Sequence, residues 1–63
     1  MTNTRITQIQ SALKAAGYKP GAIYGVIGSA TISAVNAFQS DKGLPADRYL
    51  NIATLKELGV AHN

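Results

Sequence analysis

A glycine-punctuated loop that runs directly into an amphipathic segment is the feature that most constrains how this 63-residue chain can fold. Residues 18–28, the glycine loop, contain Pro20, Gly21, Gly25 and Gly28. Glycines adopt backbone angles that other residues resist, so an irregular loop is expected here. In the next segment one side of a helical wheel collects Thr31, Ile32, Val35 and Phe38. This pattern predicts a central packing helix over residues 30–42.

The two flanking segments also follow a helical period. Apolar residues recur at three- and four-residue steps at Ile6, Ile9, Leu13 and Ala16. They predict a first helix over residues 4–16, capped near Asn3 or Thr4 and stopped by Gly17. A third helix over residues 52–58 is expected after Asn51, ending at Gly59, with three residues facing inward: Ile52, Leu55 and Leu58.

The ends of the central helix carry recognisable signals. Ser29 is predicted as its N-cap, because a serine hydroxyl can accept from a backbone amide one turn inside a helix. Gly43 suits a left-handed C-cap position, and Pro45 blocks continuation. The predicted fold is therefore all-α: residues 1–63 form a single domain, a compact three-helix bundle with the glycine-rich loop between helices one and two.

Composition limits the means of stabilising so small a domain. There is no cysteine, and the single histidine, His62, cannot build a metal site alone. We therefore expect no metal and no cofactor. With 46% apolar and 14% charged residues, stability is expected to come from packing.

The charge pattern does not favour nucleic acid as a partner. The chain carries a net charge of +3, but its six basic residues are spread along the sequence. Residues 30–42 contain only Asp41 and Lys42 as charged groups, too few for a recognition helix. Residues 1–7 lack the apolar run of a signal peptide, and nothing approaches a membrane span. Neither nucleic-acid binding nor membrane insertion is expected.

Catalytic groups are sparse. The carboxylate side chains are Asp41, Asp47 and Glu57. A glycosidase needs two facing carboxylates, whereas these three are predicted on separate elements. With no cysteine nucleophile and no interior histidine, the chain is predicted not to be an enzyme.

An ordered set of residues resembles the small peptidoglycan-binding domain of bacterial and phage cell-wall enzymes. The set comprises Ile6, Ile9, Gln10, Leu13, Gly17, Tyr18, residues 25–39, Gly43, Leu44, Thr54 and Leu58. The resemblance implies a peptidoglycan ligand, either glycan strand or stem peptide, and a fused or docked hydrolase or effector. It implies a location at the cell wall, in the periplasm or outside the cell. A chain without a leader would then be a module of a larger protein, a phage product released at lysis, or secreted cargo.

The chain departs from the family pattern at both turns, where the family usually has Asp-Gly. Tyr24 replaces the first aspartate, Arg48 replaces the second glycine, and Ile27 replaces an aromatic residue. The two turns nevertheless belong to a weak internal repeat, since each lies six residues before a threonine, Thr31 or Thr54, in the first turn of a helix. These departures leave the fold prediction intact and alter the expected ligand surface.

Several residues are interpreted as structural. Gln10 and Gln39 project close to apolar stripes, where their amides can satisfy backbone groups of the glycine loop. The full structural set is Gln10, Gly25, Gly28, Ser29, Thr31, Phe38, Gln39 and Thr54.

The resemblance places a binding groove beside the glycine loop and the helix it enters. Our candidate ligand contacts are Tyr24, Ile27, Asn36, Arg48 and Tyr49. Loop tyrosines suit sugar faces or peptide stems, and equally suit packing of a loop onto a small core. A guanidinium at Arg48 could hold a carboxylate. The predicted function is a non-catalytic wall-binding module, and the alternative is a protein-interaction or assembly domain of a phage or secretion component.

Overall fold

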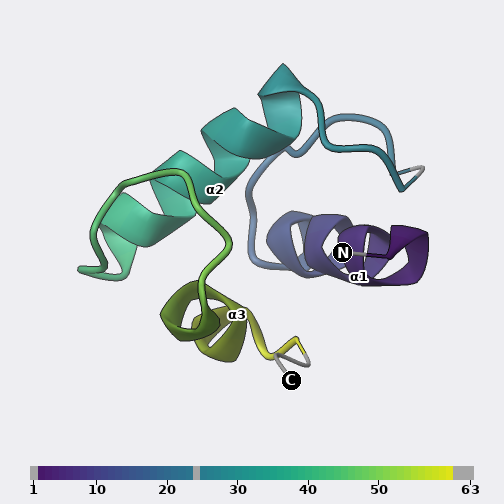
Figure 1. Cartoon of the computed structure of the whole chain (residues 1–63). Helices are drawn as coiled ribbons and strands as arrows, with labels where there is room; N and C mark the ends of the chain where they lie inside the picture. Colours follow the sequence, from purple (N-terminus) through teal and green to yellow (C-terminus); the bar gives the residue numbers. More distant parts are fainter. Residues whose placement is uncertain (1, 24, 61–63) are drawn as a thin grey trace.

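The computed structural model describes residues 2–23 and 25–60. These residues contain three helices: α1 (Asn3–Ala15), α2 (Ser29–Asp41) and α3 (Ile52–Leu58) (Figure 1). These residues contain no strand. Helix α1 packs against both α2 and α3. The predicted all-α three-helix fold is confirmed. Tyr24 and His62 lie outside the described residues.

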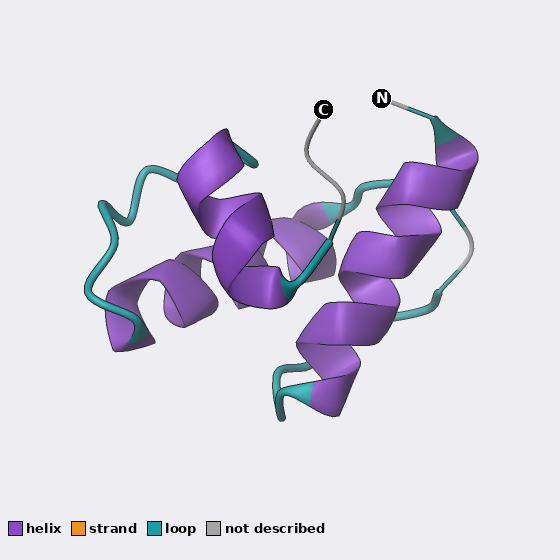
Figure 2. Ribbon diagram, turned by 90° about the horizontal axis from the view of Figure 1, so that it is seen from below, coloured by secondary structure: helices purple, strands orange, loops and turns teal. Residues whose placement is uncertain are grey.

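Two loops connect the helices on opposite sides of the molecule. The glycine loop joins α1 to α2, and the second loop, residues 44–51, joins the end of α2 to α3 (Figures 1 and 2). Each loop is therefore tied to a different end of α2.

Helix α1 begins slightly earlier than predicted. Its N-cap is Thr2, whose hydroxyl accepts from the Arg5 N–H at 3.1 Å, rather than Asn3 or Thr4. The helix ends at Ala15, one residue before the predicted end, and Gly17 follows the C-cap with a φ of 96°. This left-handed residue lets the Tyr18 N–H reach the Leu13 carbonyl at 2.9 Å, which satisfies a carbonyl at the helix end.

The predicted cap of α2 is wrong. Gly28 is the N-cap, with extended φ and ψ of −112° and −174°, and it provides no side-chain hydrogen bond. Ser29 is instead the first helical residue. A capping side chain must come from a residue with extended backbone, and the loop places that conformation one residue earlier. The predicted C-terminal signal is confirmed: Gly43 has a φ of 73°, and the Leu44 N–H donates to the Gln39 carbonyl at 2.9 Å.

Helix α3 has both predicted ends. The side chain of Asn51 accepts from the Thr54 N–H at 2.9 Å, and Gly59 closes the helix in the left-handed conformation. Such a cap stabilises a short helix by about 1 kcal/mol.

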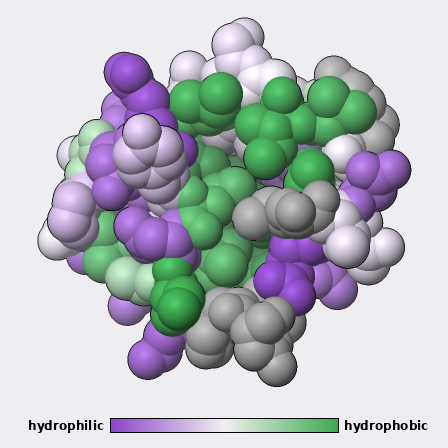
Figure 3. Space-filling model, viewed as in Figure 1, coloured by the Kyte–Doolittle hydropathy of each residue, from purple (hydrophilic) through white to green (hydrophobic). Residues whose placement is uncertain are grey.

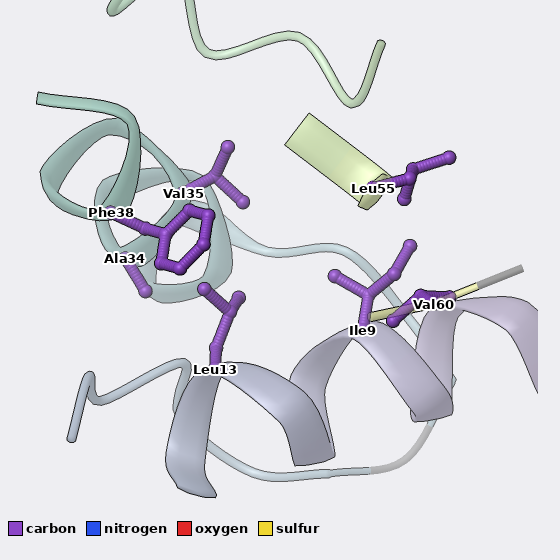
Figure 4. Packing of buried hydrophobic residues seen from close by; sticks show 7 residues of the cluster. All are labelled: Ile9, Leu13, Ala34, Val35, Phe38, Leu55 and Val60. Atoms are coloured by element: carbon purple, nitrogen blue, oxygen red, sulfur yellow. The ribbon is translucent and has the colours of Figure 1, made fainter. Parts of the chain in front are cut away.

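One apolar core lies between the three helices (Figure 4). It is formed by Ile9, Leu13, Ala34, Val35, Phe38, Leu55 and Val60. Ala12, Tyr18, Leu50 and Leu58 pack against it while partly exposed. Phe38 is 1% exposed and is the largest fully buried side chain of this core.

Three residues expected to face inward do not. Ala16 is exposed, since it follows the last helical residue of α1. Ile32 is 39% exposed because the buried face of α2 runs through Thr31, one residue round the helix. Ile52 is 59% exposed because it opens α3, and the next turn supplies the buried Leu55.

Candidate functional site

A buried glutamine of α1 organises the glycine loop. The Gln10 Nε2 donates to the Val26 carbonyl at 2.9 Å and to Thr31 Oγ1 at 3.2 Å. Its Oε1 accepts from the Gly25 N–H at 3.4 Å. Thr31 Oγ1 in turn donates to the Pro20 carbonyl at 2.8 Å. Gln10 is thus buried and hydrogen-bonded to the glycine loop, and Thr31 ties the start of α2 to the same loop.

A second buried glutamine organises the second loop in the same way. Gln39 Nε2 donates to the Tyr49 carbonyl at 2.8 Å and to Thr54 Oγ1 at 3.0 Å. Its Oε1 accepts from the Arg48 N–H at 3.0 Å. Gln39 is thus buried and hydrogen-bonded, but the expectation that it serves the glycine loop is wrong. It lies near the C-terminal end of α2, which faces the other loop.

The internal repeat in the sequence corresponds to a repeated set of glutamine hydrogen bonds. In each unit the glutamine accepts from one loop N–H, donates to the carbonyl of the next residue, and donates to a threonine hydroxyl. The residue whose N–H is accepted is left-handed in both, with φ of 78° at Gly25 and 66° at Arg48. Gly25 also lies close to α1, where an added Cβ would come within 3.2 Å of the Asn3 Cβ. The two loops are therefore held by equivalent glutamine contacts.

The candidate contacts divide between two places. Gln39 holds Arg48 and Tyr49 beside α2, one helical turn from the half-buried Asn36. Ile27, 38% exposed, precedes the N-terminus of α2, which lies about 15 Å along the helix axis from Gln39. Tyr24 lies outside the described residues. The structure brings Arg48 and Tyr49 together on the second loop, places Asn36 one turn of α2 from the glutamine that holds them, and leaves Ile27 apart.

The second loop presents its side chains on a fixed backbone. Asp47 Oδ1 accepts from the Tyr49 N–H at 2.9 Å and from Gln39 Nε2 at 3.1 Å. Tyr49 is nevertheless 73% exposed, and Arg48 is exposed. Within residues 2–23 and 25–60 the Arg48 guanidinium has no hydrogen-bond or ion-pair partner. The loop therefore offers a cation and an aromatic ring to solvent.

Other exposed apolar residues were not selected from the sequence. Val26 is 55% exposed, and Ile32 lies on the neighbouring start of α2. Figure 3 shows hydrophobic side chains gathered on this side of the molecule, over the start of α2 and the loop that enters it. Val26 is the equivalent of Tyr49 in the repeated set of glutamine hydrogen bonds. The internal repeat in the sequence could have identified Val26, because it aligns position 26 with position 49.

Two shallow hollows lie away from these candidates. The larger, about 400 Å³, is lined by Thr7, Gln8, Ser11, Ala12, Gly59 and Val60. The smaller, about 240 Å³, is lined by Lys14, Tyr18, Lys19, Pro20 and Gly21. Neither contains a predicted contact residue.

Tyr18 links the ends of the first two helices. Its hydroxyl donates to Asp41 Oδ2 at 2.7 Å, and its ring meets Phe38 edge-on with centroids 5.5 Å apart. The hydrogen bond to the Asp41 carboxylate raises the pKa of Tyr18 above its ordinary value of 10.0, with smaller contributions from burial and from the carboxylate charge. Lys42 Nζ also lies over the Phe38 ring, 5.8 Å from its centroid. These contacts assign Tyr18 to packing.

Metal-ligating residues do not gather in the described part of the chain, where no group of three or more such side chains is found. No helix there has the length and apolar character needed to cross a bilayer.

One family of known proteins matches most of the chain. The family described as "Putative peptidoglycan binding domain" matches residues 2–58. The chain belongs to this family. The matched range of the peptidoglycan-binding domain includes both glutamine-held loops and all three helices.

A solved structure gives a second comparison. The crystal structure of SltB3 from Pseudomonas aeruginosa, in complex with NAG-anhNAM-pentapeptide, matches the domain with a TM-score of 0.83 and 38% sequence identity. The match covers 92% of this chain and 16% of the SltB3 chain. The domain therefore corresponds to a small part of that protein. No curated protein sequence matches the domain.

Proposed function

We propose that this domain is a non-catalytic module that binds peptidoglycan and holds a fused or docked hydrolase, or another effector, at the cell wall. The observation that carries the proposal is the family match over residues 2–58. The peptidoglycan fragment with which SltB3 was crystallised supports the same class of ligand. The wall, the periplasm or the cell exterior is the corresponding location.

The carboxylates of the chain support binding rather than catalysis. Asp41 accepts the hydrogen bond of Tyr18, and Asp47 accepts two hydrogen bonds within the second loop. Glu57 lies on the separate helix α3. A glycosidase needs two carboxylates facing one another across a substrate, and these two aspartates hold helices and loops together instead.

Weak binding is sufficient for the proposed role. A module fused or docked to an effector converts the search for substrate into an intramolecular event, so the gain depends on effective concentration. The contacts proposed for the wall polymer are Tyr24, Ile27, Asn36, Arg48 and Tyr49.

Pelleting with intact peptidoglycan sacculi tests the function directly. The purified domain is incubated with sacculi at physiological salt beside an unrelated basic protein of similar size. We expect selective loss of the domain from the supernatant. Equal depletion of both proteins, with the domain shown to be folded by circular dichroism, would contradict the proposal.

A second function is favoured by one specific observation, the exposed apolar residues at the entrance to α2. Val26, Ile27 and Ile32 expose 55%, 38% and 39% of their surfaces. Such a patch also suits docking to a phage or secretion component. A stable complex with the product of a neighbouring gene, together with no depletion by sacculi, would favour this alternative.

A further inference from the structure

Arg48 has a left-handed backbone conformation that is otherwise found only at glycines in the described residues. Its φ is 66°, and among residues 2–23 and 25–60 every other residue with positive φ is a glycine. For a residue with a side chain this left-handed conformation is strained.

The fold needs the conformation at this position but not the side chain. The contact that fixes the turn uses the Arg48 backbone N–H, which donates to Gln39 Oε1. The equivalent contact in the glycine loop is made by Gly25, which has no side chain at all. The Arg48 guanidinium has no partner within the described residues. A glycine would therefore serve this turn better than the strained arginine does.

The neighbouring aromatic residue is exposed but firmly held. Tyr49 is 73% exposed, yet its N–H donates to Asp47 and its carbonyl accepts from Gln39. Its ring is thus carried on a backbone fixed from both sides. Rigid presentation lowers the entropy that a ligand contact must offset.

We infer that Arg48 and Tyr49 form a subsite for a carboxylate-bearing peptide. A guanidinium can pair with a carboxylate through two parallel hydrogen bonds, and a tyrosine ring supplies apolar area beside it. The nearby Asp47 carboxylate has one oxygen engaged by two donors, which reduces its competition for the guanidinium. The inference rests on the proposed function, in which the carboxylate belongs to a peptidoglycan stem peptide.

The test uses Arg48→Gly, which removes the guanidinium and relieves the backbone strain together. The control is Lys56→Gln, which makes the same change in net charge on the exposed surface of α3. The probes are a soluble muropeptide with free stem-peptide carboxylates and the same muropeptide with those carboxylates amidated. Dissociation constants are measured by calorimetry, and melting temperatures by circular dichroism.

We expect Arg48→Gly to weaken binding of the free-carboxylate probe about tenfold while its melting temperature does not fall. Lys56→Gln should bind like the parent. The parent should bind the amidated probe about as weakly as Arg48→Gly binds the free one. This pattern separates a ligand contact from a structural role.

Two results would overturn the inference while leaving the proposed function in place. One is unchanged muropeptide affinity of Arg48→Gly when the parent is still depleted by sacculi. The other is a lower melting temperature of Arg48→Gly, which would give the arginine a structural role. Failure of the parent itself to bind sacculi would instead contradict the proposed function.

Discussion

At the scale of single residues, two glutamine amides determine the paths of both loops. Each amide uses its donor and acceptor sides on groups from a loop and from the helix that follows it. All buried side-chain nitrogen and oxygen atoms in the described residues have hydrogen-bond partners. A buried amide is costly only when unpaired, so these glutamines specify the loops at little cost.

Replacing Gln39 by leucine tests this role. The substitution keeps similar volume but leaves the Arg48 N–H and the Tyr49 carbonyl without their partner. We expect a loss of about 3 kcal/mol in the free energy of unfolding, measured by urea denaturation. Gln8→Leu, at an exposed position of α1, is the matched control and should change stability little. Equal effects of the two substitutions would show that the Gln39 network does not stabilise the fold.

The sequence indicated that Gln39 would lie beside the core, but it did not indicate which loop this side chain meets. The position of Gln39 beside an apolar stripe was sufficient to predict burial and hydrogen bonding. Which loop it meets depends on the return path of residues 44–51, and no local pattern encodes that path. The strain at Arg48 could not be predicted from the sequence either. Only the backbone φ shows that Arg48 adopts the left-handed conformation usual for glycine.

At the scale of elements, glycines ended the helices where expected, whereas the start of α2 was misassigned. A glycine stop has a steric cause that operates locally, since few other residues accept the left-handed angle. A cap depends on which residue the incoming loop leaves extended, and Gly28 and Ser29 are adjacent candidates. The extended residue is Gly28, so α2 begins without a capping side chain.

Gly28→Ser should therefore stabilise the protein. Gly28 already has the extended backbone of a cap, and an added Cβ would meet no atom within 4 Å. A serine there can accept from a free N–H of α2 and also restricts the unfolded chain. We expect a gain of about 0.5–1 kcal/mol in urea denaturation.

Ser29→Ala is the control for this prediction. If Ser29 were the cap, its loss would cost about 1 kcal/mol, but as a first-turn residue it should matter little. A clear destabilisation by Ser29→Ala, with no gain from Gly28→Ser, would contradict the observed helix start.

The contact between the ends of α1 and α2 predicts a dependence on alkaline pH. The hydrogen bond to Asp41 raises the pKa of Tyr18 in the folded protein above its ordinary value of 10.0. A group with a raised folded pKa contributes its full stability below the unfolded pKa and loses it as pH rises through the folded pKa. Stability should therefore fall above about pH 10, when the phenolate forms beside the carboxylate.

Comparison with Tyr18→Phe isolates this contribution. The phenylalanine keeps the ring against Phe38 but cannot donate to Asp41. Urea denaturation at about pH 8 and above about pH 10 should show a larger loss for the parent than for the variant. Identical pH dependence of both proteins would mean that the Tyr18 hydrogen bond does not contribute to stability.

At the scale of the whole molecule, the protein has the compactness typical of a folded domain of its length. Its radius of gyration is 10.1 Å, close to the value of about 10.6 Å typical of a folded domain of this length. The all-α class followed from helical periodicity and glycine stops alone. The arrangement of the candidate ligand contacts did not follow from the sequence. The sequence places these contacts in one groove, whereas Ile27 lies on one loop and Arg48 and Tyr49 lie on the other, at opposite ends of α2.

A core of so few residues should depend strongly on its largest member. Phe38 is 1% exposed and contacts both the core and the Tyr18 ring. Truncating a buried phenylalanine to alanine costs about 3–5 kcal/mol, and a core in a domain this small supplies little more than about 3–5 kcal/mol. Phe38→Ala should therefore be largely unfolded at room temperature by circular dichroism.

Ile52→Ala removes a large apolar side chain at a position that was expected to face inward but is 59% exposed. Its helical signal and its urea midpoint should stay close to those of the parent, within about 0.5 kcal/mol in free energy of unfolding. Helical signal retained by Phe38→Ala, or lost by Ile52→Ala, would show that the core is centred elsewhere. The pair thus separates an apolar residue that holds the molecule together from one that is free to contact a partner.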